Sequence, residues 1–445
     1  MMKKVILASL LTLFAVAGYG QKKWTLQECI DYATENNIDL RQQQVAVENS
    51  EIDLNTARNS RLPSLSASAG QSFGFGRSPS IATGVYESSS SSGTSYSLSA
   101  GMTLFQGGRI NNQVKSNELN LLAAAEGLNR AREDLALGVA SRYLEALFKK
   151  ELLALSGERV SLTTQQLART EIMVGEQSVA RSQLYDMRAQ LANDELAQTN
   201  ARNDLALALL DLAQLLNMAD VDGFDIADPD TGDVIAGNAA SVRPPDDIYE
   251  TALRVKPQVR EAEYRLQSSE RGIKIAQSAL WPSVSLGLSH NSGFNHNLEK
   301  GFSNPSIKTQ LKNNRRESVG LSINIPIFSQ NQNRNGIRSA RLAAESRALE
   351  LEKVKTSLFK EIQQAHQSAV SARARYGATE KAQEAADEAY RHAVERYNEG
   401  MSTPFELNEA QNKLIISRSE QLQAKYEFLF RTKILDFYRG IEIKL

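Results

Sequence analysis

Few side chains in this sequence have the types and spacing that catalysis or metal binding would need. Its 445 residues contain one cysteine, Cys29, and four histidines that are scattered along the chain. A zinc site needs several such ligands close together, and the sequence has no H-E-x-x-H, G-x-S-x-G or P-loop motif. We therefore expect no enzyme activity, no metal centre and no cofactor. The histidines are His290, His296, His366 and His392.

Two carboxylates, Glu406 and Glu409, stand three residues apart just after a sequence that breaks a helix. That sequence is GMSTP at residues 400–404, in which Thr403 is a candidate N-cap and Pro404 suits the first helical turn. The spacing places both carboxylates on one face of the new helix. Acidic side chains at a helix start are stabilised by the helix dipole while they face water.

The charge balance and the amino terminus narrow the class of protein. Lys and Arg number 51 against 52 Asp and Glu, for a formal net charge of −1, so we expect no nucleic-acid partner. Two lysines, an apolar run and small residues predict a secretory signal peptide over residues 1–20, cleaved before Gln21. Lipidation of Cys29 is disfavoured, because this residue falls inside an expected helix. No later stretch is apolar enough for a membrane helix.

The mature sequence reads as two copies of one unit. Pro63 aligns with Pro282 at an offset of 219 residues, and the surrounding residues match without a gap. The predicted domains are a first repeat at 21–218 and a second at 246–445. An Asp-, Gly- and Pro-rich linker at 219–245 joins them. Each copy is expected to run helix, β-hairpin, very long helix, turn and helix.

Each repeat contains an expected β-hairpin, at about 64–105 and about 283–328. Apolar residues alternate there with Ser and Gly, which predicts strands with one apolar and one small polar face. The alternating segments carry no charge in a chain that is 23% charged. Such runs are typical of the lipid-facing band of an outer-membrane β-barrel. The connections at 76–93 and 294–316 are predicted to be polar, irregular loops.

Long helices occupy most of the remainder. At about 1.5 Å per residue, a helix over 330–398 would be about 100 Å long and one over 111–170 about 90 Å. Shorter helices of about 50–55 Å each are expected near 25–60, 181–217, 248–280 and 404–439. The spacing of 3 and 4 residues along the second long helix predicts a coiled-coil seam. Its members are Leu351, Val354, Leu358, Ile362, Ala365 and Ala369.

Four strands in one chain cannot close a barrel, because the smallest bacterial outer-membrane barrels have about eight. An open sheet edge in lipid leaves backbone groups unsatisfied. We therefore expect a dimer, trimer or tetramer with 8, 12 or 16 strands. Ser and Gly on the inner face are too small to fill a wide barrel, so an open pore is predicted.

Several segments resemble the TolC-type outer-membrane efflux proteins. They are WTLQECIDYA at 24–33, LPSL at 62–65, WPSV at 281–284, LFQGGR at 104–109, IPIFSQN at 325–331 and RYNEG at 396–400. The resemblance covers essentially all of the mature chain. It implies an α+β membrane protein: a homotrimer whose 12-stranded barrel continues into a periplasmic tunnel of long α-helices.

The resemblance also implies function and site residues. Such proteins are passive exit ducts of tripartite efflux or type I secretion systems. They are embedded in outer-membrane lipid and dock with a periplasmic adaptor and an inner-membrane transporter of RND, ABC or MFS type. By resemblance, Glu406 and Glu409 form cation-favouring rings at the periplasmic entrance, while Tyr397 and Gln183 lie near its closure. The hairpin tips fall at Gly175, Gly400 and Pro404, and the strands start after Pro63 and Pro282.

Some alternatives stay open at this point. Gln183 and Ser402 depart from residues that the family often carries, an Asp and an Arg, which puts the entrance mechanism in doubt. Glu406 and Glu409 could be ordinary helix-start acids, and Tyr397 a packing residue. The main rival function is a trimeric, membrane-anchored coiled-coil adhesin or structural protein.

Overall fold

The computed structural model describes residues 23–79, 83–219, 221–229, 243–299 and 303–444. The predicted signal peptide and most of the predicted linker lie outside these residues. The chain forms two compact units. Unit 1 comprises Met1–Val45, Glu126–Arg260 and Lys353–Leu445, and unit 2 comprises Ala46–Ala125 and Glu261–Glu352. Each unit therefore combines segments from both predicted repeats.

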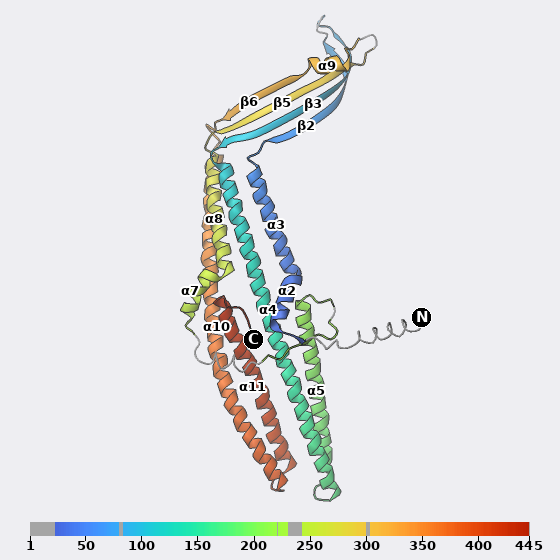
Figure 1. Ribbon diagram of the computed structural model, residues 1–445, viewed down its shortest axis with the longest axis vertical. Helices are drawn as coiled ribbons and strands as arrows, with labels where there is room; N and C mark the ends of the chain where they lie inside the picture. The colour runs from blue at the N-terminus through green and yellow to red at the C-terminus, as the bar shows by residue number, and fades with distance from the viewer. Residues whose placement is uncertain (1–22, 80–82, 220, 230–242, 300–302, 445) are drawn as a thin grey trace, which may run out of the picture. The chain divides into compact units, whose positions relative to one another are not determined.

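Unit 2 contains an antiparallel sheet of four strands in the order β2-β3-β5-β6 (Figure 1). Its strands are β2 (Ser64–Pro79), β3 (Tyr86–Gln106), β5 (Ser283–Asn297) and β6 (Arg316–Asn324). One row of directly opposed residues is Leu65, Ala100, Leu288 and Val319. The next row is Ser64, Gly101, Gly287 and Gly320. Opposed residues point to the same face, so the predicted division into an apolar and a small polar face is confirmed.

The predicted loops are shorter than expected. β2 and β3 stay paired out to Pro79 and Tyr86, so most of the stretch 76–93 is strand and not loop. Serine and glycine repeats lack a hydrophobic pattern, yet their backbones pair as well as any other. β5 continues to Asn297, and the stretch 294–316 includes a short helix, α9 (Ile307–Asn313). β6 ends at Asn324, because Pro326 cannot donate to a strand ladder.

Two of the expected shorter helices are each divided in two. α2 (Leu26–Asn36) and α3 (Ile38–Asn59) meet at Asn37, and α7 (Pro245–Val255) and α8 (Pro257–Ser278) meet at Lys256. Both junction residues have an extended backbone, with ψ of 128° and 124°. At the second break, Pro257 forces the preceding residue out of the helical conformation. Sequence reasoning missed these breaks.

The long helices form two antiparallel hairpins (Figure 1). α4 (Arg109–Gly175) turns into α5 (Arg181–Leu215), and α10 (Gln332–Asn398) turns into α11 (Pro404–Tyr438). Leu358, Ile362 and Ala369 of α10 are fully buried, which confirms the predicted coiled-coil seam. Among the residues that the structure describes, no helix is both long and apolar enough to cross a membrane.

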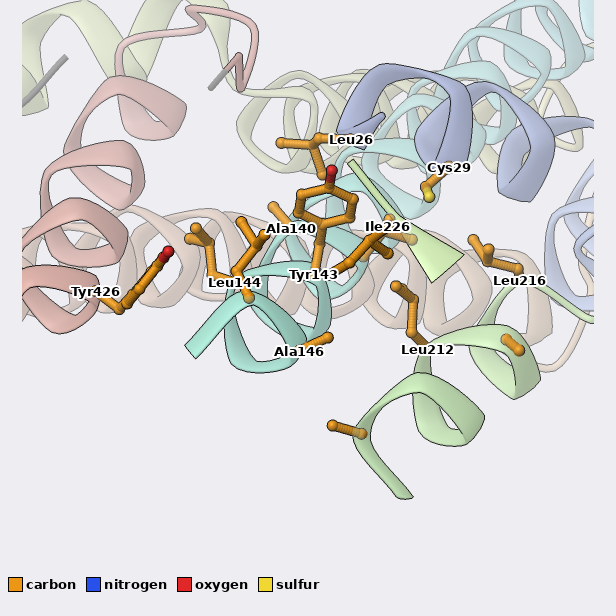
Figure 2. Packing of buried hydrophobic residues seen from close by; sticks show 14 of the residues in the cluster. Leu26, Cys29, Ala140, Tyr143, Leu144, Ala146, Leu212, Leu216, Ile226 and Tyr426 are labelled. Atoms are coloured by element: carbon orange, nitrogen blue, oxygen red, sulfur yellow. The ribbon is translucent and has the colours of Figure 1, made fainter. Parts of the chain in front are cut away.

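The main hydrophobic core lies in unit 1, where α2, α4, α5 and α11 meet (Figure 2). Cys29 is fully buried there, and Thr25 opens α2 with a capping box to Glu28. A two-residue parallel ladder joins β1 (Lys23–Trp24) to β4 (Asp225–Ile226). The Tyr143 hydroxyl lies within hydrogen-bonding distance of two carbonyls, 3.0 Å from that of Trp24 on β1 and 2.8 Å from that of Ala227, the residue after β4. Strand β1 is thereby fixed to the core.

Candidate functional site

The small polar face of the sheet is hollowed. A cavity of about 820 Å³ is lined by serines and glycines of β2, β3, β5 and β6, by apolar residues of β3 and β5 such as Met102 and Leu286, and by the end of α3. Serine hydroxyls bond across this face, as between Ser68 and Ser97 and between Ser289 and Ser318, both at 2.7 Å. The opposite face exposes its apolar side chains: Phe75 is 75% exposed and Val319 is 74% exposed. In water such an exposed apolar face favours aggregation, whereas lipid chains can cover it.

The turn between α10 and α11 has the predicted chemistry. Gly400 adopts φ of 73°, a left-handed conformation that glycine reaches without strain. Thr403 caps α11, accepting from the Glu406 amide at 3.3 Å, while the Glu406 carboxylate accepts from the Thr403 amide at 3.4 Å. Pro404 occupies the first helical turn. The predicted N-cap and helix break are therefore confirmed.

Glu406 and Glu409 are both exposed, and each has a basic neighbour. The Glu406 carboxylate lies 4.0 Å from the Arg396 guanidinium, and Glu409 pairs with Lys413 at 2.7 Å, one helical turn away. Capping accounts for the position of Glu406 within one chain. A cation-favouring ring of these carboxylates stays a prediction.

Tyr397 is nearly buried and joins α10 to α4. Its hydroxyl lies 3.7 Å from the Met173 sulfur, and the Arg169 guanidinium lies 5.5 Å from its ring centre. Arg169 also bonds to Asn398. The tyrosine therefore packs between the two hairpins close to their turns, within unit 1.

The turn between α4 and α5 is built differently. α4 ends at Gly175, Gln177 has φ of 57°, and the N-cap Ala180 offers no side-chain acceptor. Gln183 is half-buried, and its backbone N–H donates to the Ala180 carbonyl at 3.1 Å. Its side-chain oxygen is buried without a hydrogen-bond partner in the described part of the chain. The turn itself is therefore held by backbone bonds, and the Arg188–Glu171 ion pair at 3.0 Å joins the two helices beside it.

A polar layer that sequence reasoning missed connects the two hairpins. Asp194 on α5 is 1% exposed, and its carboxylate pairs with Arg159 Nε at 2.7 Å. It also accepts from Thr163 at 2.7 Å and Gln190 at 2.8 Å. Arg159 and Thr163 of α4 reach α11 in turn, through Asn412 at 2.9 Å and Gln411 at 3.4 Å. A charged residue in a helical seam fixes the register of the helices around it. In the sequence, Asp194 looks like an ordinary surface residue. The one pattern that could have indicated its bonding is the four-residue spacing from Gln190.

Lys256 forms a second buried polar contact, at the break between α7 and α8. It is 2% exposed, its ammonium lies 2.8 Å from Glu133 of α4, and it sits 3.3 Å from the Phe437 ring centre on α11. Burial lowers the pKa of Lys256 below its ordinary value, although Glu133 opposes that shift. The contact ties the helix break to both neighbouring helices. No group of three or more His, Cys, Asp or Glu side chains able to hold a metal ion occurs among the described residues.

The sequence matches the model of one protein family in two segments, 29–218 and 248–434, and the family is described as outer membrane efflux protein. The chain belongs to this family. The two matched segments agree with the internal duplication inferred from the sequence. Members are outer-membrane channels of efflux systems, so this protein is an outer-membrane efflux channel that extends into the periplasm. The adhesin alternative has no support, and the family is not a class of enzymes.

Individual relatives and structures agree with this assignment. The chain is 25% identical over 370 residues to a probable outer membrane lipoprotein, SilC, of Salmonella typhimurium, covering 78% of this chain and 72% of SilC. It is 21% identical over 428 residues to the outer membrane efflux protein BepC of Brucella suis, covering 95% and 87%.

Two solved structures have the same fold. The structure of CusC gives a TM-score of 0.78 at 21% identity and covers 94% of this chain and 92% of its own. That of VceC from Vibrio cholerae gives 0.74 at 15% identity and covers 94% and 97%. Channels of this family act as trimers with adaptor and inner-membrane transporter partners.

Proposed function

We propose that three copies of this chain form a passive exit duct of a tripartite efflux assembly. The observation that carries the proposal is the sheet: four strands, one exposed apolar face and one hollowed face of Ser and Gly. The duct would receive substrate from an inner-membrane transporter through a periplasmic adaptor. The chain supplies a path and no chemical step.

Strand closure supports three copies. β2 and β6 are the sheet edges and pair on one side only within the described chain. Unpaired backbone groups in lipid cost several kcal/mol each, so β6 of one copy would pair with β2 of the next. Three sheets then give a closed ring of 12 strands. The apolar face would meet lipid, and the Ser and Gly face would line the water-filled interior.

Exposed stripes on two helices fit the same arrangement. Ile38, Val45 and Ile52 of α3 recur every seven residues and are 60%, 53% and 63% exposed. Leu342 and Leu349 of α10 have the same spacing and are 66% and 60% exposed. A seven-residue repeat is the pattern of helices that pack along one another. Neighbouring copies would cover these stripes.

The periplasmic entrance would form at the two hairpin turns, around Gly175 and around Gly400 and Pro404. Three copies would bring Glu406 and Glu409 into rings of carboxylates, which favour cations in a pore. Replacing both by glutamine is expected to lower the cation preference of single channels in planar bilayers. The matched control is Glu352→Gln, on an exposed site of α10, which should leave selectivity unchanged. Equal cation selectivity of the unmodified channel, the double variant and the control would contradict the proposed ring of carboxylates.

The first test of the proposal is the mass of the mature protein in outer-membrane extracts, corrected for bound detergent. Three chains per particle are expected. A monomer would overturn the proposal, because four strands cannot close. The transporter type, RND, ABC or MFS, and a role in type I secretion would be decided by crosslinking the particle in cells and identifying the captured inner-membrane protein.

A further inference from the structure

The outer ends of the two sheet edges do not match in length. β2 has sixteen residues and β6 has nine. If β6 of one copy pairs with β2 of the next, seven residues of β2 are left without a strand partner. Such pairing between copies belongs to the proposed trimer.

The place that a longer β6 would occupy is already filled within each chain. Beyond Asn291, no strand of the described residues pairs with β5 on its β6 side. Its backbone bonds there to side-chain amides instead. Asn314 donates to the Gly293 carbonyl at 2.8 Å, and Gln310 accepts from the Asn295 amide at 2.8 Å.

Asn304 completes this edge by bonding to both backbone groups of Asn297. Its oxygen accepts from the Asn297 amide at 2.7 Å, and its nitrogen donates to the Asn297 carbonyl at 2.8 Å. One amide side chain thereby reproduces the two bonds that a neighbouring strand residue would make. The Ser292 hydroxyl also donates to the Leu311 carbonyl, at 2.8 Å. The segment that carries α9 is therefore held on β5 as a substitute for strand.

We infer that residues 303–314 of one copy, with α9 at their centre, cover the outer edge of β2 at residues 73–79 in the next copy. The α9 segment lies on the same side of β5 as β6, so it would face the neighbouring β2 directly beyond the paired part. Both surfaces are exposed in the single chain and carry apolar residues: Phe73 is 62%, Phe75 is 75% and Ile307 is 49% exposed. The outer rim would then be closed by a loop and helix, and the inner part of the seam by strand pairing.

Hydrogen exchange on the trimer in lipid nanodiscs tests this inference. Within one chain, every second amide of β2 points away from β3 and has no partner. Assembly should protect these amides along the whole strand. The triple variant N304A, Q310A and N314A frees the α9 segment from β5 and should speed exchange at 73–79 while leaving 64–71 protected. Asn313→Ala, an exposed change on the same helix, is the control.

The outcomes separate the two proposals. Loss of the trimer in the unmodified protein would overturn the proposed function. A normal trimer with unprotected amides at 73–79, or with protection that the triple variant does not alter, would overturn this inference alone.

A crosslink provides a second measurement that does not depend on the triple variant folding. Gly76→Cys has open space around it, Thr309→Cys is on the exposed side of α9, and the natural Cys29 is buried. Oxidation of the double variant should give crosslinked chains in denaturing gels. Their absence, with the trimer intact, would contradict the inference.

Discussion

α5 and α11 each have 35 residues and each forms the second helix of a hairpin, yet they differ in burial. Twelve residues of α11 are buried, including Phe428 and Leu429, against six residues of α5, three of which are alanines. α11 is thus a core helix of its own chain. α5 exposes large apolar residues such as Leu196 at 59% and Leu207 at 61%, and α11 exposes Phe405 at 76% and Ile416 at 57%. Duplicated segments can therefore share length and position while they differ in how many of their residues the single chain buries.

The largest expected effect is from a core residue of α11. Phe428 is 1% exposed and stacks on Tyr376, with ring centres 5.8 Å apart. Phe428→Ala should lower the free energy of unfolding by about 3–5 kcal/mol, measured by loss of helical circular dichroism on heating. The control on α5, Leu207→Ala, should leave chain stability nearly unchanged. Equal losses in both variants would show that the two helices do not differ as described.

A smaller effect is expected from the polar layer that joins α5 to α11. Asp194→Ala leaves Arg159, Thr163 and Gln190 without their shared acceptor, and should cost about 2–3 kcal/mol. Asp186→Ala, at an exposed position of the same helix, should cost almost nothing. Denaturant titration would measure both. If Asp194→Ala left the free energy of unfolding unchanged, the layer would contribute little to holding the hairpins together.

One substitution at each hairpin turn should change helix stability by about 1 kcal/mol, and the two changes should have opposite signs. Thr403→Ala removes the cap of α11 and should destabilise it by about 1 kcal/mol. Ala180→Ser supplies α5 with the acceptor that it lacks and should gain up to about that amount. Hydrogen exchange in the first turn of each helix would report both changes. A stabilised turn in the Thr403 variant would contradict the comparison.

The smallest effect concerns Lys256 under the last turn of α11, and it is confined to the pH range between the pKa of this group in the folded and in the unfolded chain. Because the folded state lowers the pKa of Lys256 below 10.5, the unfolded chain binds more protons between the two pKa values. Stability from this group should therefore rise as pH increases through that window and stay constant below it. Comparing unfolding midpoints of the unmodified protein and Lys256→Met across this pH range isolates the contribution of Lys256 to stability. A difference in unfolding midpoint that does not change with pH would contradict the burial of a charged ammonium at this position.

The sequence predicted those features that repeat over many residues. The alternation of apolar residues with Ser and Gly located all four strands, and the seam at Leu358 and Ile362 located the core face of α10. The cap at Thr403 was also predictable, because Thr and Pro at that spacing have few other roles.

Features that depend on tertiary contacts were missed. Asp194 is recognisable only once Arg159 and Thr163 are known to face it. The break at Lys256 was missed although Pro257 marks it in the sequence, and the break at Asn37 interrupts an otherwise regular helical pattern. The outer half of the first β-hairpin was predicted as a loop, since its serines follow no hydrophobic pattern. The cation ring at Glu406 and Glu409 stays a prediction, because it depends on a neighbouring copy.

The serine and glycine wall of the sheet has a consequence for movement through the proposed duct. Its hydroxyls are numerous, uncharged and repeated at nearly equal intervals along β2, β3, β5 and β6. A solute would exchange one weak hydrogen bond for another of similar strength at each step, so its free-energy profile would have shallow minima. Conduction needs binding weak enough for release. Selection among substrates would then occur before the sheet is reached, and residence there would depend on solute size more than on chemistry.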